Sequence, residues 1–185
     1  MMLTLILKLF RKGPDALICA TSLITVNLPI HKRSSVCCIR FEIKGDIVVT
    51  APFYCDYGFN ISVGNNFYTN HNCTILDAAK VEIGDSVFLA PNCVISTAGH
   101  ATDPLQRSQG LEFAKPIRIG NHVWIGANVS VLPGVTIGDN TIIGAGSVVN
   151  RDIPSGVVAA GNPCRVIRNI TEEDKHKYPV FSSQD

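Results

Sequence analysis

A six-residue repeat between residues 119 and 149 restricts the folds open to this chain more than any other feature. Every sixth residue is aliphatic, in the series Ile119, Ile125, Val131, Ile137, Ile143 and Val149. Glycine directly follows the aliphatic residue in four of these six units. Neither a helical period of about 3.6 residues nor a two-residue alternation produces this pattern. The repeat predicts a parallel β-helix, in which each six-residue side directs an aliphatic residue inward and glycine eases the corner.

The same period occurs earlier in the chain. Inward positions are expected at Val63, Thr69, Ile75, Ile83, Leu89 and Ile95, with a two-residue slip between the third and the fourth. After Ser96 the repeat stops, and residues from about 97 to 116 are polar and rich in turn residues. We expect this stretch to be extruded from the solenoid as a loop, and long loops on rigid scaffolds usually carry function.

Length, charge and cysteine content limit the class of function. A chain of 185 residues with a formal net charge of +1 and 17% charged residues fits one domain and argues against nucleic acid as a partner. The seven cysteines include no C-x-x-C pair and no spacing typical of a disulfide framework or a zinc site. Cys73 and Cys93 fall at the fifth position of their hexapeptides, where small apolar residues are expected to pack. We interpret the cysteines as reduced, buried thiols and predict a cytoplasmic protein.

The two ends of the chain lie outside the repeat. In residues 1–44 the basic residues follow the first apolar run, so a signal peptide is not expected. The second apolar run is shorter than a membrane span of about 20 residues. Two interpretations of the segment remain, an interfacial anchor or an irregular segment packed on the first coil. After the repeat domain, assigned to residues 45–168, Thr171 can cap a short helix in the tail 169–185. We expect that helix to cover the open end of the solenoid.

Of the five histidines, only His100 lies in the interrupted stretch. A neutral imidazole can take a proton from an alcohol at physiological pH, so His100 is the candidate general base. The alternative is an ordinary surface histidine. His71 and His122 could approach His100 from neighbouring coils, but the chain has no H-x-x-x-H pair. A metal site is therefore not expected.

Four other residues have both a functional and a structural interpretation. Asn70 could hydrogen-bond a ligand or simply cap a turn. Trp124 precedes the inward Ile125, so it should lie outside the coil, against a ligand or a subunit. Arg165 and Arg168 suit a phosphate-bearing ligand, or they represent ordinary surface charge.

Five segments together resemble the maltose/galactoside O-acetyltransferase group of the hexapeptide-repeat acyltransferases. They are FYCDYGFNI at 53–61, NHNCTILD at 70–77, TAGH at 97–100, VWIG at 123–126 and AAGNPCRVIR at 159–168. The last segment, with DKHKY at 174–178, is closest to the galactoside branch. The resemblance implies an all-β, left-handed parallel β-helix and a homotrimer with active sites between subunits. It also implies acetyl transfer from acetyl-CoA to a sugar hydroxyl without a metal ion.

The resemblance also implies roles for particular residues. His100 matches the general base, and Asn70 matches an asparagine that holds the acceptor and the transition state and borders the cofactor. Ala127 and Ala145 match positions along the pantetheine arm of CoA. The other cofactor positions are Trp124, Asn150, Arg151, Arg165 and Arg168, of which the two arginines of the 159–168 segment match residues near the nucleotide phosphates. The acceptor positions are Asp56, Tyr68, Asn70 and Asp77.

The resemblance covers residues 47 to 178, with two departures. Asn150 replaces a threonine, and the first forty residues do not resemble the helical, charged segment that the group folds over its acceptor. Two alternatives therefore remain beside a sugar acetyltransferase. One is the same chemistry on an antibiotic or a lipo-oligosaccharide, and the other is a non-catalytic trimeric scaffold.

Overall fold

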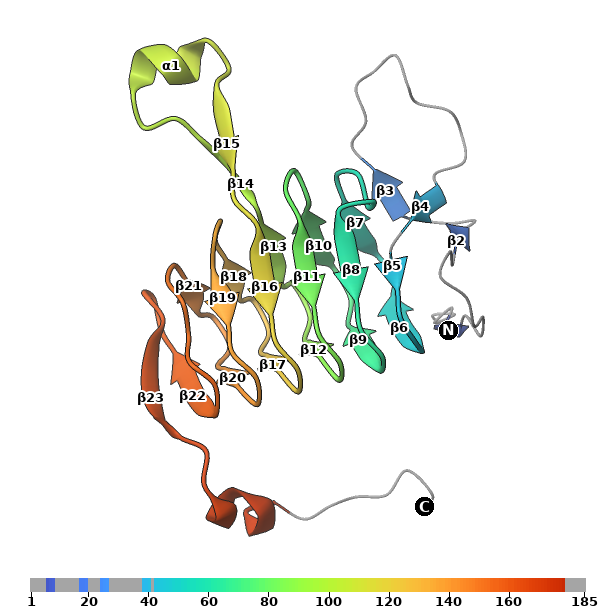
Figure 1. Ribbon diagram of the computed structural model, residues 1–185, viewed down its shortest axis with the longest axis vertical. Coiled ribbons are helices and arrows are strands. Elements are labelled where there is room, and N and C mark those ends of the chain that lie inside the picture. The colour runs from blue at the N-terminus through green and yellow to red at the C-terminus, as the bar shows by residue number, and fades with distance from the viewer. Residues whose placement is uncertain (1–5, 9–16, 20–23, 27–37, 41, 179–185) are drawn as a thin grey trace, which may run out of the picture.

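The computed structural model describes the backbone of residues 6–8, 17–19, 24–26, 38–40 and 42–178, and the side chains of residues 44–178. In this part of the chain the backbone winds as a parallel β-helix with three flat faces (Figure 1). We call these faces sheets I, II and III. In each coil the chain passes from sheet III to sheet I, then to sheet II, and back to sheet III.

Each coil between residues 42 and 149 contributes one strand to every sheet, and strands outside this range extend sheets I and II. Sheet I comprises β1 (Ile6–Lys8), β6 (Ile47–Thr50), β9 (Phe67–Thr69), β12 (Phe88–Leu89), β17 (Trp124–Ile125), β20 (Ile142–Ile143), β22 (Val157–Ala160) and β23 (Arg165–Asn169). Sheet II comprises β3 (Ile24–Val26), β7 (Phe53–Cys55), β10 (Cys73–Leu76), β13 (Val94–Ser96), β18 (Ser130–Val131) and β21 (Val148–Val149). Sheet III comprises β5 (Glu42–Ile43), β8 (Ile61–Val63), β11 (Val81–Ile83), β16 (Ile117–Ile119) and β19 (Thr136–Ile137). Pairing is parallel except at β1–β6 and β22–β23.

The core is a stack of aliphatic residues that occupy the same position in successive coils. Ile83, Ile119 and Ile137 lie in register on sheet III, and the first of these also pairs with Val63. All the predicted inward positions are buried. The structure adds a second inward position two residues earlier, occupied for example by Val123. Cys73 and Cys93 occupy this second position and are buried, in agreement with their interpretation as packing residues.

Glycine and asparagine or aspartate form a repeated device where sheet III passes into sheet I. The pairs are Gly45-Asp46, Gly64-Asn65, Gly84-Asp85, Gly120-Asn121 and Gly138-Asp139. The side chain of each Asn or Asp, from Asn65 onward, accepts a hydrogen bond from the backbone N–H of the corresponding residue one coil earlier, at 2.6–3.0 Å. A Cβ on the preceding coil's glycine would collide with the accepting oxygen. Glycine is needed at this corner because coils approach closely there, and not because its φ is unusual.

The stretch predicted as a loop is an ordered arm. Strands β14 (Ala98–His100) and β15 (Glu112–Ala114) pair antiparallel, and helix α1 (Pro104–Ser108) closes the tip. The arm projects from the connection between sheets II and III, well clear of the coils (Figure 1). Asp103 caps α1 through a hydrogen bond from the N–H of Gln106 at 2.8 Å. The arm therefore holds its own shape without packing on the solenoid.

The two ends of the chain lie beyond the regular coils. Most of residues 1–44, on which the expectation of an anchor or an irregular segment falls, lies outside the described residues. Of the strands that are described there, β1 and β3 extend sheets I and II, and β2 (Leu17–Cys19) pairs with β4 (Cys38–Arg40). No helix in the part of the chain that is described has the length and apolar character to cross a bilayer. The tail helix is a 3₁₀ helix, η2 (Glu172–His176), and it buries no residue. The prediction that it covers the solenoid end was wrong, because EEDKH offers no apolar face.

Gly84 provides a test of the corner device. In Gly84→Ala the new Cβ would lie 2.5 Å from Asn121 Oδ1 and 2.8 Å from the backbone of Gly120, so two coils must separate. We expect a loss of about 2–3 kcal/mol in the free energy of unfolding, measured by urea denaturation. Gly110→Ala is the control, because that glycine has a φ of +75° and nothing within 4 Å, and it should lose only about 1 kcal/mol. Equal losses would contradict the close-approach explanation.

Candidate active site

His100 lies on the inner strand of the arm, opposite a carboxylate. The antiparallel register pairs it with Glu112, and His100 Nε2 lies 3.6 Å from Glu112 Oε1. Both side chains are exposed, at 59% and 57%. Arg107 does not neutralise this pair, because its Nη1 donates to the backbone oxygens of Ala101 and Thr102. The arm therefore presents an imidazole beside an acidic group, open to an incoming molecule.

Asn70 lies at a different corner, where sheet I passes into sheet II. Its Oδ1 accepts a hydrogen bond from the N–H of His71 at 2.8 Å, so part of the side chain caps the turn. Ala127 and Ala145 follow on later coils of the same corner, and the N–H of Gly146 donates a hydrogen bond to the oxygen of Ala127. Both alanines have short side chains, and Ala145 is exposed, so the surface of this corner is low. Such a surface allows a slender ligand to approach the main chain.

The predicted catalytic pair does not meet within one chain. His100 extends from the corner between sheets II and III, whereas Asn70 lies at the corner between sheets I and II. The whole width of sheet II, represented by β10 and β13, separates these two corners. Asn150 and Arg151 are also at the His100 corner, on the opposite side of sheet II from Ala127 and Ala145. The predicted residues therefore form two half-sites.

Asp77 supports the chain instead of facing outward. Its side chain is fully buried, and its two oxygens accept hydrogen bonds from the N–H groups of residues 56, 57, 58 and 60 at 2.8–3.3 Å. The side-chain amide of Asn60 returns a bond to the oxygen of Asp77 at 2.7 Å. Every direction in which the carboxylate can accept a hydrogen bond is used by this loop. Direct contact with an acceptor, expected from the resemblance, has no support in this geometry.

Asp56 begins the loop that Asp77 holds. Burial raises the pKa of the Asp56 carboxyl, and the neighbouring carboxylates of Asp77 and Glu112 raise it further. Glu112 is also the partner of His100, so Asp56, Glu112 and His100 lie along one edge of the β-helix. The part of this half-site around Asp56 is therefore acidic, although Lys80 and Arg151 lie at the same corner.

Tyr68 and Trp124 lie on the outer surface of sheet I. The register stacks Tyr68, Phe88 and Trp124 on successive coils, and the first two rings meet edge to face with centroids 6.2 Å apart. Trp124 is 51% exposed and borders a shallow apolar hollow with Ile142. The hollow is also lined by His122, at the corner where sheet III passes into sheet I, so the aromatic row lies between that corner and the one that holds Asn70.

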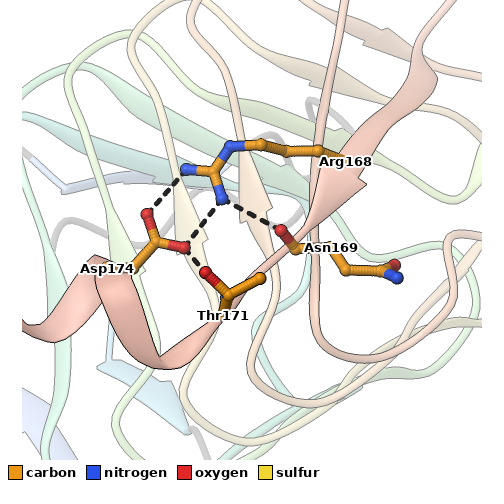
Figure 2. Close-up of polar contacts among 4 residues, drawn as sticks. All are labelled: Arg168, Asn169, Thr171 and Asp174. Atoms are coloured by element: carbon orange, nitrogen blue, oxygen red, sulfur yellow. Dashed lines mark hydrogen bonds and ion pairs between the residues drawn. The ribbon is translucent and has the colours of Figure 1, made fainter.

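The two C-terminal arginines are already engaged. Arg168 makes a bidentate pair with Asp174, with both N–O distances 2.7 Å, and also donates to the oxygen of Asn169 (Figure 2). This pairing holds the pKa of Asp174 well below its usual range. Arg165 donates to the oxygen of Cys164 at 2.7 Å. In this structure Arg168 fastens the tail to β23, so a phosphate would have to compete with Asp174 for it.

The histidines do not assemble a metal site. His71, His100 and His122 lie at three different corners of the coil, so the approach considered from the sequence does not occur within one chain. Among the described residues no group of three or more potential ligands gathers around one point. We therefore assign no metal chemistry to these side chains.

Comparison with known proteins identifies the family. The profile of the family described as Bacterial transferase hexapeptide (six repeats) matches residues 116–151. Galactoside O-acetyltransferase of Escherichia coli is 51% identical over 150 residues, which cover 80% of this chain and 74% of that protein. Protein YJL218W of Saccharomyces cerevisiae is 64% identical over 129 residues, covering 70% of this chain and 66% of that protein.

Solved structures agree with the sequence matches. A galactoside acetyltransferase in complex with coenzyme A superimposes with a TM-score of 0.73 at 51% identity, over 76% of this chain and 72% of that one. A maltose O-acetyltransferase from Clostridium difficile 630 gives a TM-score of 0.70 at 54% identity, over 71% of each chain. The chain belongs to the maltose/galactoside O-acetyltransferase group of the hexapeptide-repeat transferases. The left-handed parallel β-helix expected from the resemblance is thereby confirmed.

Three features of the candidate site of this acetyltransferase were not found from the sequence. Glu112 was not recognised, because its pairing with His100 depends on the register of an arm that the repeat does not predict. Phe88 stands before an inward residue as Trp124 does, so the repeat could have revealed it. The exposed aromatic pair Tyr57 and Phe59 has no periodic signal, because it lies in a connection between strands.

Asp56 gives a test of the acidic half-site of this acetyltransferase. Because the folded protein raises the pKa of Asp56, its ionised form disfavours folding above that pKa, and the effect disappears below the pKa of the unfolded chain. Asp56→Asn should unfold at a higher temperature than the natural protein at about pH 7, and at the same temperature at about pH 3. Circular dichroism during heating measures both. Asp103→Asn controls for the loss of one negative charge, and an equal gain at both pH values would rule out the electrostatic explanation.

Proposed function

We propose that this protein transfers an acetyl group from acetyl-CoA to a hydroxyl group of a sugar, in active sites formed between the subunits of a homotrimer. The observation that carries the proposal is the division of the site. His100 and Asn70 match catalytic residues of the group, yet they lie on opposite sides of sheet II in one chain. Two protomers side by side would place the His100 corner of one against the Asn70 corner of the next.

The proposed chemistry is direct transfer with a general base. His100 takes the proton of the acceptor hydroxyl as the oxygen attacks the thioester carbonyl. The tetrahedral intermediate carries a negative oxygen, near which the Asn70 amide donates a hydrogen bond. When the carbon–sulfur bond breaks, the proton held by His100 passes to the leaving CoA thiolate. Atoms and charge balance without a covalent acyl-enzyme, because the thioester is already activated.

The small residues of the Asn70 corner support a binding site for CoA there. Ala127 and Ala145 have short side chains at that corner, and the galactoside acetyltransferase that superimposes on this chain holds coenzyme A. In this proposal Trp124 lines the cleft, while Asn150 and Arg151 of the neighbouring protomer, with Arg165, lie toward the nucleotide. Arg168 takes part only if a phosphate displaces Asp174. Tyr68 and Asp56 face the acceptor, and the cytoplasmic location stays a prediction.

Mixed trimers test both the residues and the assembly. His100→Ala and Asn70→Ala should each lose at least about 100-fold in kcat, measured by release of CoA thiol with a galactoside, a glucoside and maltose as acceptors. Co-expression of the two variant chains should restore about one quarter of the natural activity, because each mixed trimer contains one interface with both intact residues.

Two controls make the result decisive. Each variant expressed alone shows the residual rate, and differently tagged chains purified in sequence show that mixed trimers form. If the mixed trimers have no more activity than the single variants, both residues belong to one site within one chain, or one of them does not take part in catalysis. A sedimentation experiment that found monomers would contradict the proposed assembly directly.

A further inference from the structure

The loop of residues 56–60 is fixed more firmly than a surface turn requires. Four backbone N–H groups of this loop donate to the buried carboxylate of Asp77, and the Asn60 side chain donates to its backbone oxygen. A carboxylate that accepts several backbone N–H bonds makes strong, charge-assisted hydrogen bonds. Gly58 allows the turn through a φ of +84°. The loop is therefore held in one conformation.

This rigid loop exposes two aromatic rings. Tyr57 is 41% exposed and Phe59 is 65% exposed, while the rings lie 5.3 Å apart between centroids at an angle of 42°. The aromatic side chains of Phe53 and Phe67 in the neighbouring strands are buried in the core. Tyr57 and Phe59 thus do not contribute to the core of the β-helix. Exposed aromatic surface that is held in a fixed position is typical of a binding site.

The aromatic pair lies on the same edge of the β-helix as His100. The loop 56–60 and the base of the arm are both connections between sheets II and III, with the connection 77–80 between them. Two coil spacings put them about 10 Å apart along this edge. Asp56 begins the loop and Glu112 lies in the arm, so both carboxylates belong to this edge. A disaccharide spans such an interval, and a monosaccharide does not.

We propose that Tyr57 and Phe59 form a second acceptor subsite, which binds the neighbouring ring of an oligosaccharide whose first ring is acetylated beside His100. The inference rests on the proposed function. A pyranose has an apolar C–H face that packs on aromatic rings and a rim of hydroxyl groups that donate to carboxylates. Asp56 and Glu112 supply such acceptors next to the rings. The corner carries the exposed cation of Lys80 as well as these carboxylates, so the ligand class is a neutral sugar.

Acceptor length provides the test. For the natural protein and Phe59→Ala, we would measure kcat and KM with methyl glucoside, methyl galactoside, maltose and lactose at saturating acetyl-CoA. In Phe59→Ala the KM for disaccharides should rise about five- to tenfold relative to the KM for the methyl glycosides. Phe59→Trp should keep the low KM for disaccharides. Tyr178→Ala, which removes an exposed aromatic ring from the tail, should leave the KM ratio as in the natural protein.

Each outcome separates this inference from the proposed function. Turnover of the methyl glycosides by the natural protein reports the acetyl transfer itself. An unchanged ratio of the two KM values in Phe59→Ala would overturn the second subsite while leaving that activity intact. Sedimentation of Phe59→Ala completes the test, because a loss of trimers would assign the pair to a subunit contact instead. If the natural protein acetylates no sugar, saturation-transfer NMR of maltose against both proteins decides the question by binding alone.

Discussion

The close approach of successive coils where sheet III passes into sheet I is the constraint on which the rest of the structure depends. Each turn must leave its backbone near the next turn, and the glycines permit this because a Cβ would collide with the following coil. The asparagine or aspartate after the glycine then satisfies a backbone donor of the coil before it. Since the corners repeat at a fixed spacing, the three sheets stay in register, and residues far apart in sequence are stacked along each edge.

Several candidate site residues lie where this repetition is broken. A solenoid with short connections at every corner presents only flat sheets and narrow edges, which cannot surround a substrate. The arm at 98–114 and the loop 56–60 are the departures at one corner. They bring His100, Glu112 and Asp56 to one edge, while the regular corner across sheet II keeps small residues beside Asn70. In the proposed function a complete site is formed by two chains, because the rigid prism keeps these edges apart.

The repeat allowed the fold to be predicted because its signal is carried by every coil. The aliphatic series from Ile119 to Val149 determines which residues face inward, and the resemblance supplied His100 and Asn70 as the candidate catalytic pair, which stays a prediction. The positions of single polar residues were harder to predict. Asp77 and Asp56 look alike in sequence, yet one accepts hydrogen bonds from a whole loop and the other faces an acidic surface. Nothing local distinguishes them, since the loop that uses Asp77 lies 17 to 21 residues earlier.

Arg168 shows why a matching residue need not have a fixed role. Its bidentate pair with Asp174 ties η2 to the last strand, and the N–H of Thr171 donates to the same carboxylate at 2.9 Å. The Arg168 side chain is 42% exposed and that of Asp174 is 24% exposed, so the pair lies near solvent and contributes little net stability. A nucleotide phosphate carries more charge than a carboxylate and accepts more hydrogen bonds. Binding of a CoA phosphate at Arg168 would therefore break the pair with Asp174. The tail would then lose the ion pair that ties it to β23.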